Sequence, residues 1–285
     1  MSGVRMQKKQ QPLERRTMEV RASRRARRGM VAFVCAACMA LGVRETAAAY
    51  VITKQNKRIE GTDIRAKANG EIVLTTPQGT RTFYPGQYLK AVADKPADFD
   101  RAVRLVNAGK HAEAVEILKG IVERFRYLEW DQRARALLAK AYAALGQHEK
   151  AAAVFEEMFR IDPSLEKNRE LQWAYRDQLL AAGKHAELSR ILEEVIRRGD
   201  RPDAARAYLL RGDLEMARNQ VESAALDYLR TVILFKDQKD VQPMALFKAA
   251  EALEKLRDAR ARELYEELVR EYPSSPYAAK AKGKI

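Results

Sequence analysis

Cysteine is nearly absent from this sequence. The chain of 285 residues has two, Cys35 and Cys38, and both lie within the first 49 residues. That segment is expected to be removed from the mature protein, as argued below. The remaining chain therefore needs no disulfide framework, and it can carry neither thiol catalysis nor a thiolate metal site.

Histidine is almost as scarce. The three histidines are His111, His148 and His185, which occupy the same place in three successive repeats. Stacked helix pairs place equivalent positions about 10 Å apart, whereas zinc ligands all lie about 2 Å from one ion. We therefore interpret these histidines as turn residues that pack against the neighbouring helix.

Familiar catalytic motifs are missing as well. The sequence has no G-x-S-x-G elbow, no Walker-type loop and no H-E-x-x-H motif. Its paired glutamates stand beside basic residues three or four positions away, which is typical of a solvated helix face. These absences predict a non-enzymatic protein with no catalytic residue, metal, cofactor or small-molecule substrate.

The apolar run near the N-terminus is too short to span a membrane. It covers Met30–Val43, which is 14 residues, and a spanning helix needs about 18 or more. A basic region precedes it, and the small residues Ala47, Ala48 and Ala49 follow. This order is that of a secretory signal peptide. We predict that residues 1–49 are a signal peptide, with Ala47 and Ala49 in the cleavage motif, and that the protein is exported to the periplasm or cell envelope.

Two other interpretations of the N-terminus involve the membrane. If the signal peptide is not cleaved, it would remain as an N-terminal membrane anchor. If it is cleaved, the protein would contact a membrane only by association. Lipidation at Cys38 would make the protein a lipoprotein. The sequence disfavours lipidation, because Cys35 stands where the lipoprotein motif has Leu or Val and apolar residues continue past Cys38.

The positive charge of the chain belongs mostly to this N-terminal segment. The whole sequence has 53 basic and 39 acidic residues, but residues 1–49 hold 11 of the basic ones and only 3 of the acidic ones. Residues 50–96 then have 8 basic and 4 acidic residues, and residues 97–285 have 34 and 32. Neither part offers the strong basic field that nucleic acid binding requires, so we expect no nucleic acid partner.

Residues 50–96 show strand signals. Short extended segments are expected at 50–53, 58–60, 63–67, 71–75 and 80–84. Asn69-Gly70 predicts a two-residue type I′ hairpin turn, in which both residues have positive φ, and Pro85-Gly86 is expected to end the sheet. Four or five short strands predict a small β module, either SH3-like or a small twisted sheet. Phe83 and Tyr84 are interpreted as local core, with a recognition surface as the alternative.

From residue 97 to residue 285 the apolar residues follow a helical period, and short blocks of sequence repeat. The repeated blocks end at residues 114, 151, 188, 224 and 261, with steps of 37, 37, 36 and 37. A period in the thirties is typical of a helical solenoid, which presents a long surface to a partner. We predict a mainly α fold of about five helix pairs, followed by a C-terminal capping helix.

These repeats resemble the tetratricopeptide-repeat family. The second copy has Tyr142 on its first helix, Gly146 at the turn, Ala151 and Phe155 on its second helix, and Pro163 at its end, in the order of the family pattern. The small alanine lets two helices cross closely, the aromatic residue fills the gap between repeats, and the proline stops the helix. The third copy departs from the pattern, with leucine at both helix positions. The other repeat positions assigned in this way are Gly109, Ala114, Gly183, Gly212, Ala224, Tyr228, Ala261, Tyr265 and Pro273.

The resemblance implies a groove lined by the first helix of each pair. The register places Arg133, Ala136, Lys140, Trp173, Asp177, Leu180, Arg206, Leu209, Asp213 and Met216 on it. This mixed strip suits an extended or helical peptide, and Trp and Arg are enriched at binding hot spots. The alternative for Trp173 is burial between repeats.

The C-terminal stretch from Leu264 to Ala278 resembles repeat boundaries in periplasmic proteins of outer-membrane assembly and the Tol–Pal machinery. This similarity implies an envelope setting. We therefore expect an exported, non-enzymatic scaffold that binds an envelope protein or peptide through the solenoid groove. The alternative is an envelope assembly factor that binds peptidoglycan or another glycan through the β module.

Overall fold

The computed structural model describes residues 49–285. Residues 1–48, which hold Ala47 and nearly all of the predicted signal peptide, lie outside the described residues. Within residues 49–285, no helix is both long enough and apolar enough to cross a membrane.

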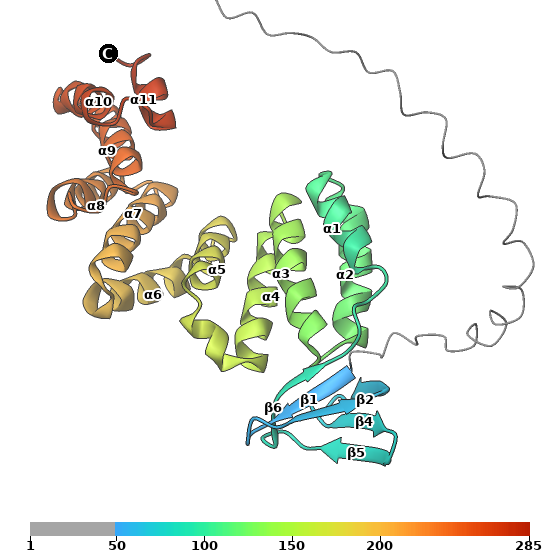
Figure 1. Ribbon diagram of the computed structural model, residues 1–285. Helices are drawn as coiled ribbons and strands as arrows, with labels where there is room; N and C mark the ends of the chain where they lie inside the picture. The colour runs from blue at the N-terminus through green and yellow to red at the C-terminus, as the bar shows by residue number, and fades with distance from the viewer. Residues whose placement is uncertain (1–48) are drawn as a thin grey trace, which may run out of the picture. The chain divides into compact units, whose positions relative to one another are not determined.

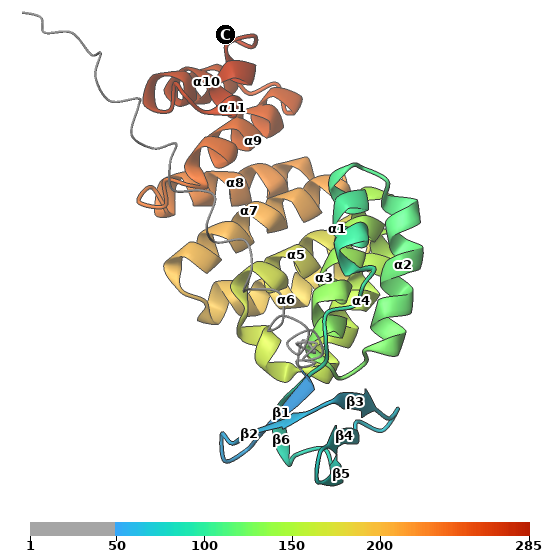
Figure 2. The same cartoon turned by 45° about the vertical axis from the view of Figure 1, so that its right-hand side comes forward.

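The expected β module consists of two small antiparallel sheets (Figure 2). One sheet has the strand order β2-β1-β6 and the other the order β3-β4-β5. The strands are β1 (Ala49–Thr53), β2 (Arg58–Gly61), β3 (Asp63–Ala66), β4 (Ile72–Thr76), β5 (Gly79–Phe83) and β6 (Tyr88–Val92). Residues that alternate along β1 and β4, namely Val51, Ile72 and Leu74, are fully buried between the sheets and form the core of the module.

Two details of the module differ from the sequence prediction. The sheet does not end at Pro85-Gly86, because β6 follows and pairs with β1. The β3–β4 hairpin exists, but its turn is not type I′: Gly70 has φ +85°, whereas Asn69 is not among the residues with positive φ. The side chain of Asn69 instead accepts a hydrogen bond from the backbone N–H of Glu71 and donates one to the Glu71 carboxylate.

The remaining chain forms five helix pairs and a short capping helix, as predicted (Figure 1). The pairs are α1 (Phe99–Asn107) with α2 (His111–Arg124), α3 (Glu129–Ala144) with α4 (His148–Ile161), α5 (Arg169–Ala181) with α6 (His185–Arg198), α7 (Arg201–Ala217) with α8 (Val221–Leu234), and α9 (Gln242–Lys255) with α10 (Arg260–Glu271). A 3₁₀ helix, η1 (Pro163–Lys167), links α4 to α5, and α11 (Pro276–Ala281) closes the array. Each helix packs mainly on the helices next to it in sequence, as in a solenoid.

The residues assigned to the repeat pattern occupy the expected places. Ala114, Ala151, Leu188, Ala224 and Ala261 are all buried where the second helix crosses the first. The large side chains Tyr142, Phe155, Leu192, Tyr228 and Tyr265 are buried as well. Pro163 opens η1, and Pro273 lies in the loop between α10 and α11. The leucines of the third repeat therefore fill the same positions as the alanine and aromatic residue elsewhere.

Gly212 is required by the packing of Tyr228. A Cβ atom at position 212 on α7 would overlap the Tyr228 ring, which lies across this point of the helix. Glycine in a helix interior costs about 1 kcal/mol relative to alanine. The Tyr228 hydroxyl then donates a hydrogen bond to Oδ1 of the adjacent Asp213 over 2.7 Å.

The β module is attached to the loop between α2 and α3 and to the first turn of α3. Trp130 Nε1 donates a hydrogen bond of 2.8 Å to the carbonyl of Ala93, and the Tyr127 hydroxyl donates one of 3.3 Å to the carbonyl of Ala68. Leu128, next to Tyr127, is buried in the core of the module. Tyr127 has φ +61°, a conformation that is unfavourable for a residue with a Cβ atom. These contacts fix the module against the first two repeats.

Candidate partner-binding groove

The predicted groove residues divide into exposed and buried ones. Arg133, Lys140 and Asp177 are exposed, and Ala136, Leu180, Arg206, Asp213 and Met216 are partly exposed. Two others do not reach the surface: the exposed fraction is 1% for Trp173 and 5% for Leu209. For Trp173 the alternative of burial between repeats holds, and Leu209 likewise belongs to the core. Neither side chain can anchor a partner by direct contact.

Trp173 instead supports the charged residues around it. The guanidinium carbons of Arg176 and Arg206 lie 4.4 Å and 4.6 Å from the centre of its ring. Its Nε1 donates a hydrogen bond of 3.1 Å to Asp203 Oδ1 on α7. Burial lowers the pKa of Arg176, and cation–π contacts with a desolvated guanidinium contribute about 1–2 kcal/mol. The indole therefore orients Arg206, which lies 3.9 Å from the carboxylate of Asp177.

Asp213 forms the centre of a polar cluster on the last two repeats. Besides the Tyr228 hydroxyl, both of its carboxylate oxygens accept hydrogen bonds of 2.6 Å from Lys248 Nζ on α9. Burial and the neighbouring Asp213 carboxylate raise the pKa of Tyr228, so its hydroxyl stays protonated as a donor.

A second cluster of the same kind lies one repeat further along. The Tyr265 hydroxyl donates a hydrogen bond of 3.0 Å to Glu254, and Lys284 Nζ lies 3.0 Å from both oxygens of that carboxylate. Hydrogen bonds from Lys284 and then Tyr265 lower the pKa of Glu254. Tyr228 and Tyr265 occupy equivalent repeat positions. The last two repeats thus share a set of tyrosine, carboxylate and lysine that the sequence analysis did not find.

Both clusters border one groove, which we call the C-terminal groove. Its volume is about 480 Å³, and it is lined by Asp213, Met216, Tyr228, Lys248, Glu251, Glu254, Lys255 and Lys284. Within the part of the chain that the structure describes, Glu251 and Lys255 have no ion-pair partner, and both are exposed. The groove therefore offers a free carboxylate, a free ammonium group and the thioether of Met216 to a ligand.

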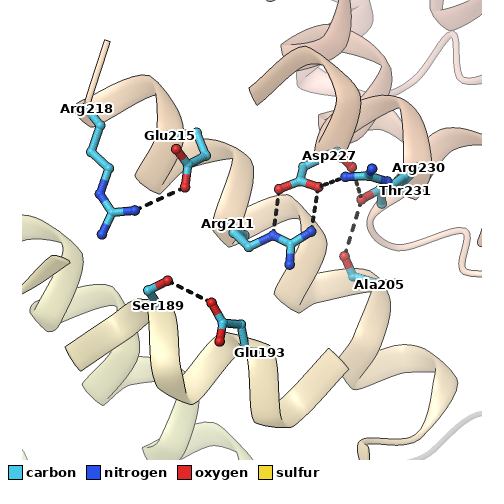
Figure 3. Close-up of polar contacts among 9 residues, drawn as sticks. All are labelled: Ser189, Glu193, Ala205, Arg211, Glu215, Arg218, Asp227, Arg230 and Thr231. Atoms are coloured by element: carbon cyan, nitrogen blue, oxygen red, sulfur yellow. Dashed lines mark hydrogen bonds and ion pairs between the residues drawn. The ribbon is translucent and has the colours of Figure 1, made fainter. Parts of the chain in front are cut away.

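A buried ion pair also joins α7 to α8. Figure 3 shows Arg211 of α7 reaching Asp227 of α8, which also contacts Arg230. Arg211 makes two bonds of 2.7 Å to the two carboxylate oxygens, and Asp227 is 3% exposed. The hydrogen bonds to Asp227 raise the pKa of Arg211. This arrangement holds the two helices in register, and neither Arg211 nor Asp227 is among the residues that line the groove.

The histidines lie at the first residues of α2, α4 and α6. His148 Nδ1 is 3.0 Å from Gln178 Oε1 on α5, a contact between neighbouring repeats of the kind predicted for a turn residue. Among residues 49–285, no group of three or more His, Cys, Asp or Glu side chains is placed to hold a metal ion.

Comparison with protein-family models finds matches to the helical repeats. Three family models, each described as a tetratricopeptide repeat, match residues 105–172, 177–240 and 244–275, which together make up more than half of the chain. No curated protein matches the sequence.

Solved structures with similar repeats share little sequence identity with the chain. MamA from Desulfovibrio magneticus RS-1 is 20% identical, with a TM-score of 0.46 over 62% of this chain and 94% of that one. A putative kinesin light chain from Podosopora anserina with nearly identical TPR-like repeats is also 20% identical, with a TM-score of 0.47 over 61% of this chain and 95% of that one.

Proposed function

Since the chain belongs to the tetratricopeptide-repeat family, whose repeats form scaffolds for protein–protein interaction, we propose that it is an exported envelope scaffold that binds a protein partner in the C-terminal groove. The assignment of the binding site to this groove rests on the two tyrosine–carboxylate–lysine clusters that line it. Their hydrogen bonds hold the walls in place before a ligand arrives, which lowers the entropic cost of binding.

The partner is expected to be a peptide segment with side chains of both charges. Lys248 already neutralises Asp213, and Lys284 neutralises Glu254, so these groups shape the groove. Glu251 and Lys255 remain to pair with a basic and an acidic side chain of the partner, and Met216 offers an adaptable apolar contact. Such a segment would belong to the envelope protein or peptide that the sequence predicts as the partner.

Site-specific photo-crosslinking in cells tests this assignment. A photoreactive amino acid at Met216 should crosslink to a discrete protein, and the double variant Glu251→Gln with Lys255→Gln should reduce that crosslink several-fold. The matched control places the same amino acid at Ile233 of α8, which is 69% exposed outside the groove. Equal crosslinking from both positions, or none from Met216, would rule out the groove as the binding site.

The proposal of export rests on the N-terminal sequence pattern. The structure adds one consideration about the cleavage position: Ala49 is 3% exposed and pairs with Gly61 of β2. Cleavage after Ala49 would take a buried residue away from β1, whereas an earlier cut would leave it in place. Mass spectrometry of the mature N-terminus from the envelope fraction would identify the position, and a full-length protein in the cytoplasm would refute export.

Binding of peptidoglycan through the β module is the second candidate. One observation favours it: Phe83 is buried as predicted, but the prediction that Tyr84 also belongs to the local core is wrong, because Tyr84 is 53% exposed on the module. An exposed aromatic ring offers a flat apolar face. If this candidate is correct, Tyr84→Ala should abolish sedimentation with purified cell walls and leave the groove crosslink unchanged.

A further inference from the structure

A second candidate binding site lies at the outer edge of β3. This strand pairs with β4 on one side, and no other strand between residues 49 and 285 pairs with its opposite edge. β1 pairs antiparallel with β2 as far as Ala49 opposite Gly61, and the chain then continues from β2 into β3 through Thr62. β1 therefore pairs with β2 but does not extend along β3.

The backbone groups on this edge follow from the register of the hairpin. Lys67 N–H donates to the carbonyl of Glu71 over 2.8 Å, and these two residues continue the β3–β4 register as a hydrogen-bonded pair. Because hydrogen-bonded and non-hydrogen-bonded pairs alternate in an antiparallel ladder, Ile64 and Ala66 direct their N–H and C=O groups away from β4. The edge thus presents two donors and two acceptors at the spacing of a strand.

The residues that carry these groups line a cleft. Its volume is about 1000 Å³, and residues 62–66 form one wall of it. The other wall is α2, which contributes Ile117, Gly120 and Ile121. Extended backbone needs little width, and the small residues Ala66, Ala93 and Gly120 keep the cleft open.

Gly120 leaves the α2 wall of this cleft without a side chain. It stands in the middle of α2, where glycine costs about 1 kcal/mol relative to alanine. A Cβ atom at this position would meet nothing within 4 Å, so no internal packing requires glycine there. A strand on the edge of β3 would run between the two walls and would approach the helix at this point.

We propose that the cleft binds an extended peptide segment of another protein, which adds to β3 as an antiparallel strand and places small side chains against Gly120. Main-chain hydrogen bonds to an exposed sheet edge are a known source of affinity. The charges of the lining are balanced, with four acidic residues and four basic ones, namely Asp63, Asp94, Asp98 and Glu116 and Arg65, Lys95, Arg101 and Arg124. Backbone pairing and side-chain size, rather than net charge, would therefore select the peptide. The site does not depend on the function proposed for the C-terminal groove.

Selection of a phage-displayed library of random nonapeptides on the full-length protein tests the proposal. Peptides that bind should lose at least tenfold in affinity for Ala66→Pro, which removes an outward N–H without breaking the β3–β4 ladder. The matched control is Thr82→Pro on the outer edge of β5, where the same alternation also directs the N–H outward. It should leave the affinity unchanged.

A second variant tests the opposite wall of the cleft. Gly120→Leu fills the gap beside α2 and should also reduce affinity at least tenfold, with the circular dichroism spectrum unchanged. Lys248→Ala in the C-terminal groove should have no effect on these peptides. The proposal is overturned if the library yields no binder, or if binders tolerate both Ala66→Pro and Gly120→Leu. It is also overturned if the full-length protein dimerises through this edge and Ala66→Pro makes it monomeric, because a second copy would then be the occupant.

Discussion

Each turn between two paired helices needs one residue with positive φ, and the chain meets this need in two ways. Gly109, Gly146 and Gly183 have φ between +70° and +74° in the first three pairs, whereas Asn219 and Arg257 have φ +61° and +56° in the last two. Glycine adopts this conformation without a steric cost, but a residue with a Cβ atom pays about 1–2 kcal/mol.

Arg257→Gly is therefore expected to stabilise the protein. The relief of backbone strain outweighs the extra freedom of glycine in the unfolded chain, so the free energy of unfolding should rise by about 1 kcal/mol. Urea denaturation monitored by circular dichroism measures it. Gly146→Ala is the reciprocal change and should lower the same quantity by about 1 kcal/mol. A destabilised Arg257→Gly variant would mean that contacts of the arginine side chain outweigh its backbone strain.

A second prediction at this scale concerns the buried carboxyl group of Asp131. Burial raises its pKa to about 6, although it accepts a hydrogen bond from the N–H of Tyr127 and faces Arg135 at 3.8 Å. The folded protein thus holds this proton more tightly than the unfolded chain does. The contribution of Asp131 to stability is therefore fully present below pH 4, and it is lost as the pH rises through 6.

Asp131→Asn should remove this dependence, because the amide oxygen can still accept from Tyr127 and carries no charge. Between pH 4 and pH 7 the unfolding free energy of the original protein should fall relative to that of the variant, by an amount on the order of 2 kcal/mol. Denaturation at several pH values measures the difference. A constant difference over this range would show that Asp131 titrates normally.

Trp173 shows what residue-level prediction from the sequence could not decide. Its position in the repeat places it on the groove face of α5. That position does not determine whether the side chain is exposed to solvent. Whether the indole reaches solvent depends on Arg176 and Arg206, which pack on its ring, and on Asp203, which accepts a hydrogen bond from its N–H. Arg206 and Asp203 come from the next repeat, about 30 residues away, so no local pattern signals them.

At the scale of helices, the buried pair of Arg211 and Asp227 links α7 to α8. Asp227→Asn keeps the shape of the side chain but leaves the partly buried guanidinium without its counter-charge. Breaking such a pair costs about 3 kcal/mol. Urea denaturation should show this loss, together with faster hydrogen exchange in α7 and α8.

The matched control for this variant is an ion pair on the surface. Arg201 and Asp237 lie 2.6 Å apart, and both side chains are more than half exposed. Hydrogen bonds from Arg201 lower the pKa of Asp237 to about 2, but solvent screens this pair. Asp237→Asn should leave the unfolding midpoint unchanged within error. Equal losses for the two variants would show that burial does not determine the strength of these pairs.

The sequence predicted helices better than strands. The helices repeat, so each copy reinforces the assignment of the others, and turn glycines mark the boundaries in the first three pairs. β6 was missed because Tyr88–Val92 follows Pro85-Gly86, a strong end signal, and its pairing with β1 spans almost 40 residues. The turn type at Asn69-Gly70 was wrong because the Asn69 side chain binds Glu71 and stabilises a different backbone conformation.

At the scale of the whole molecule, the array is coupled mainly between neighbours in sequence, which is why its architecture could be predicted from a period alone. The candidate groove could be predicted only in part. Asp213 and Met216 follow from the repeat register, but Lys284 reaches the groove from the last residues of the chain. That residue lies beyond the fifth repeat, where the periodic pattern gives no guidance.

Nearest-neighbour coupling makes a prediction about the C-terminal cap. Ala278 and Ala281 of α11 are buried against the cluster that includes Phe247 and Leu268, and Tyr277 lies 5.7 Å from Phe247 between ring centres. Deletion of residues 276–285 uncovers this apolar surface at the end of the array. Hydrogen exchange followed by mass spectrometry should then show loss of protection in α9 and α10, while α3 and α4 remain as protected as in the full-length chain. Lys284→Ala removes an exposed ion pair with Glu254, but the Tyr265 hydroxyl still binds that carboxylate, so both regions should remain protected. Equal loss of protection along the chain would instead show that the repeats unfold as one cooperative unit, so that stability at the cap is transmitted to the β module.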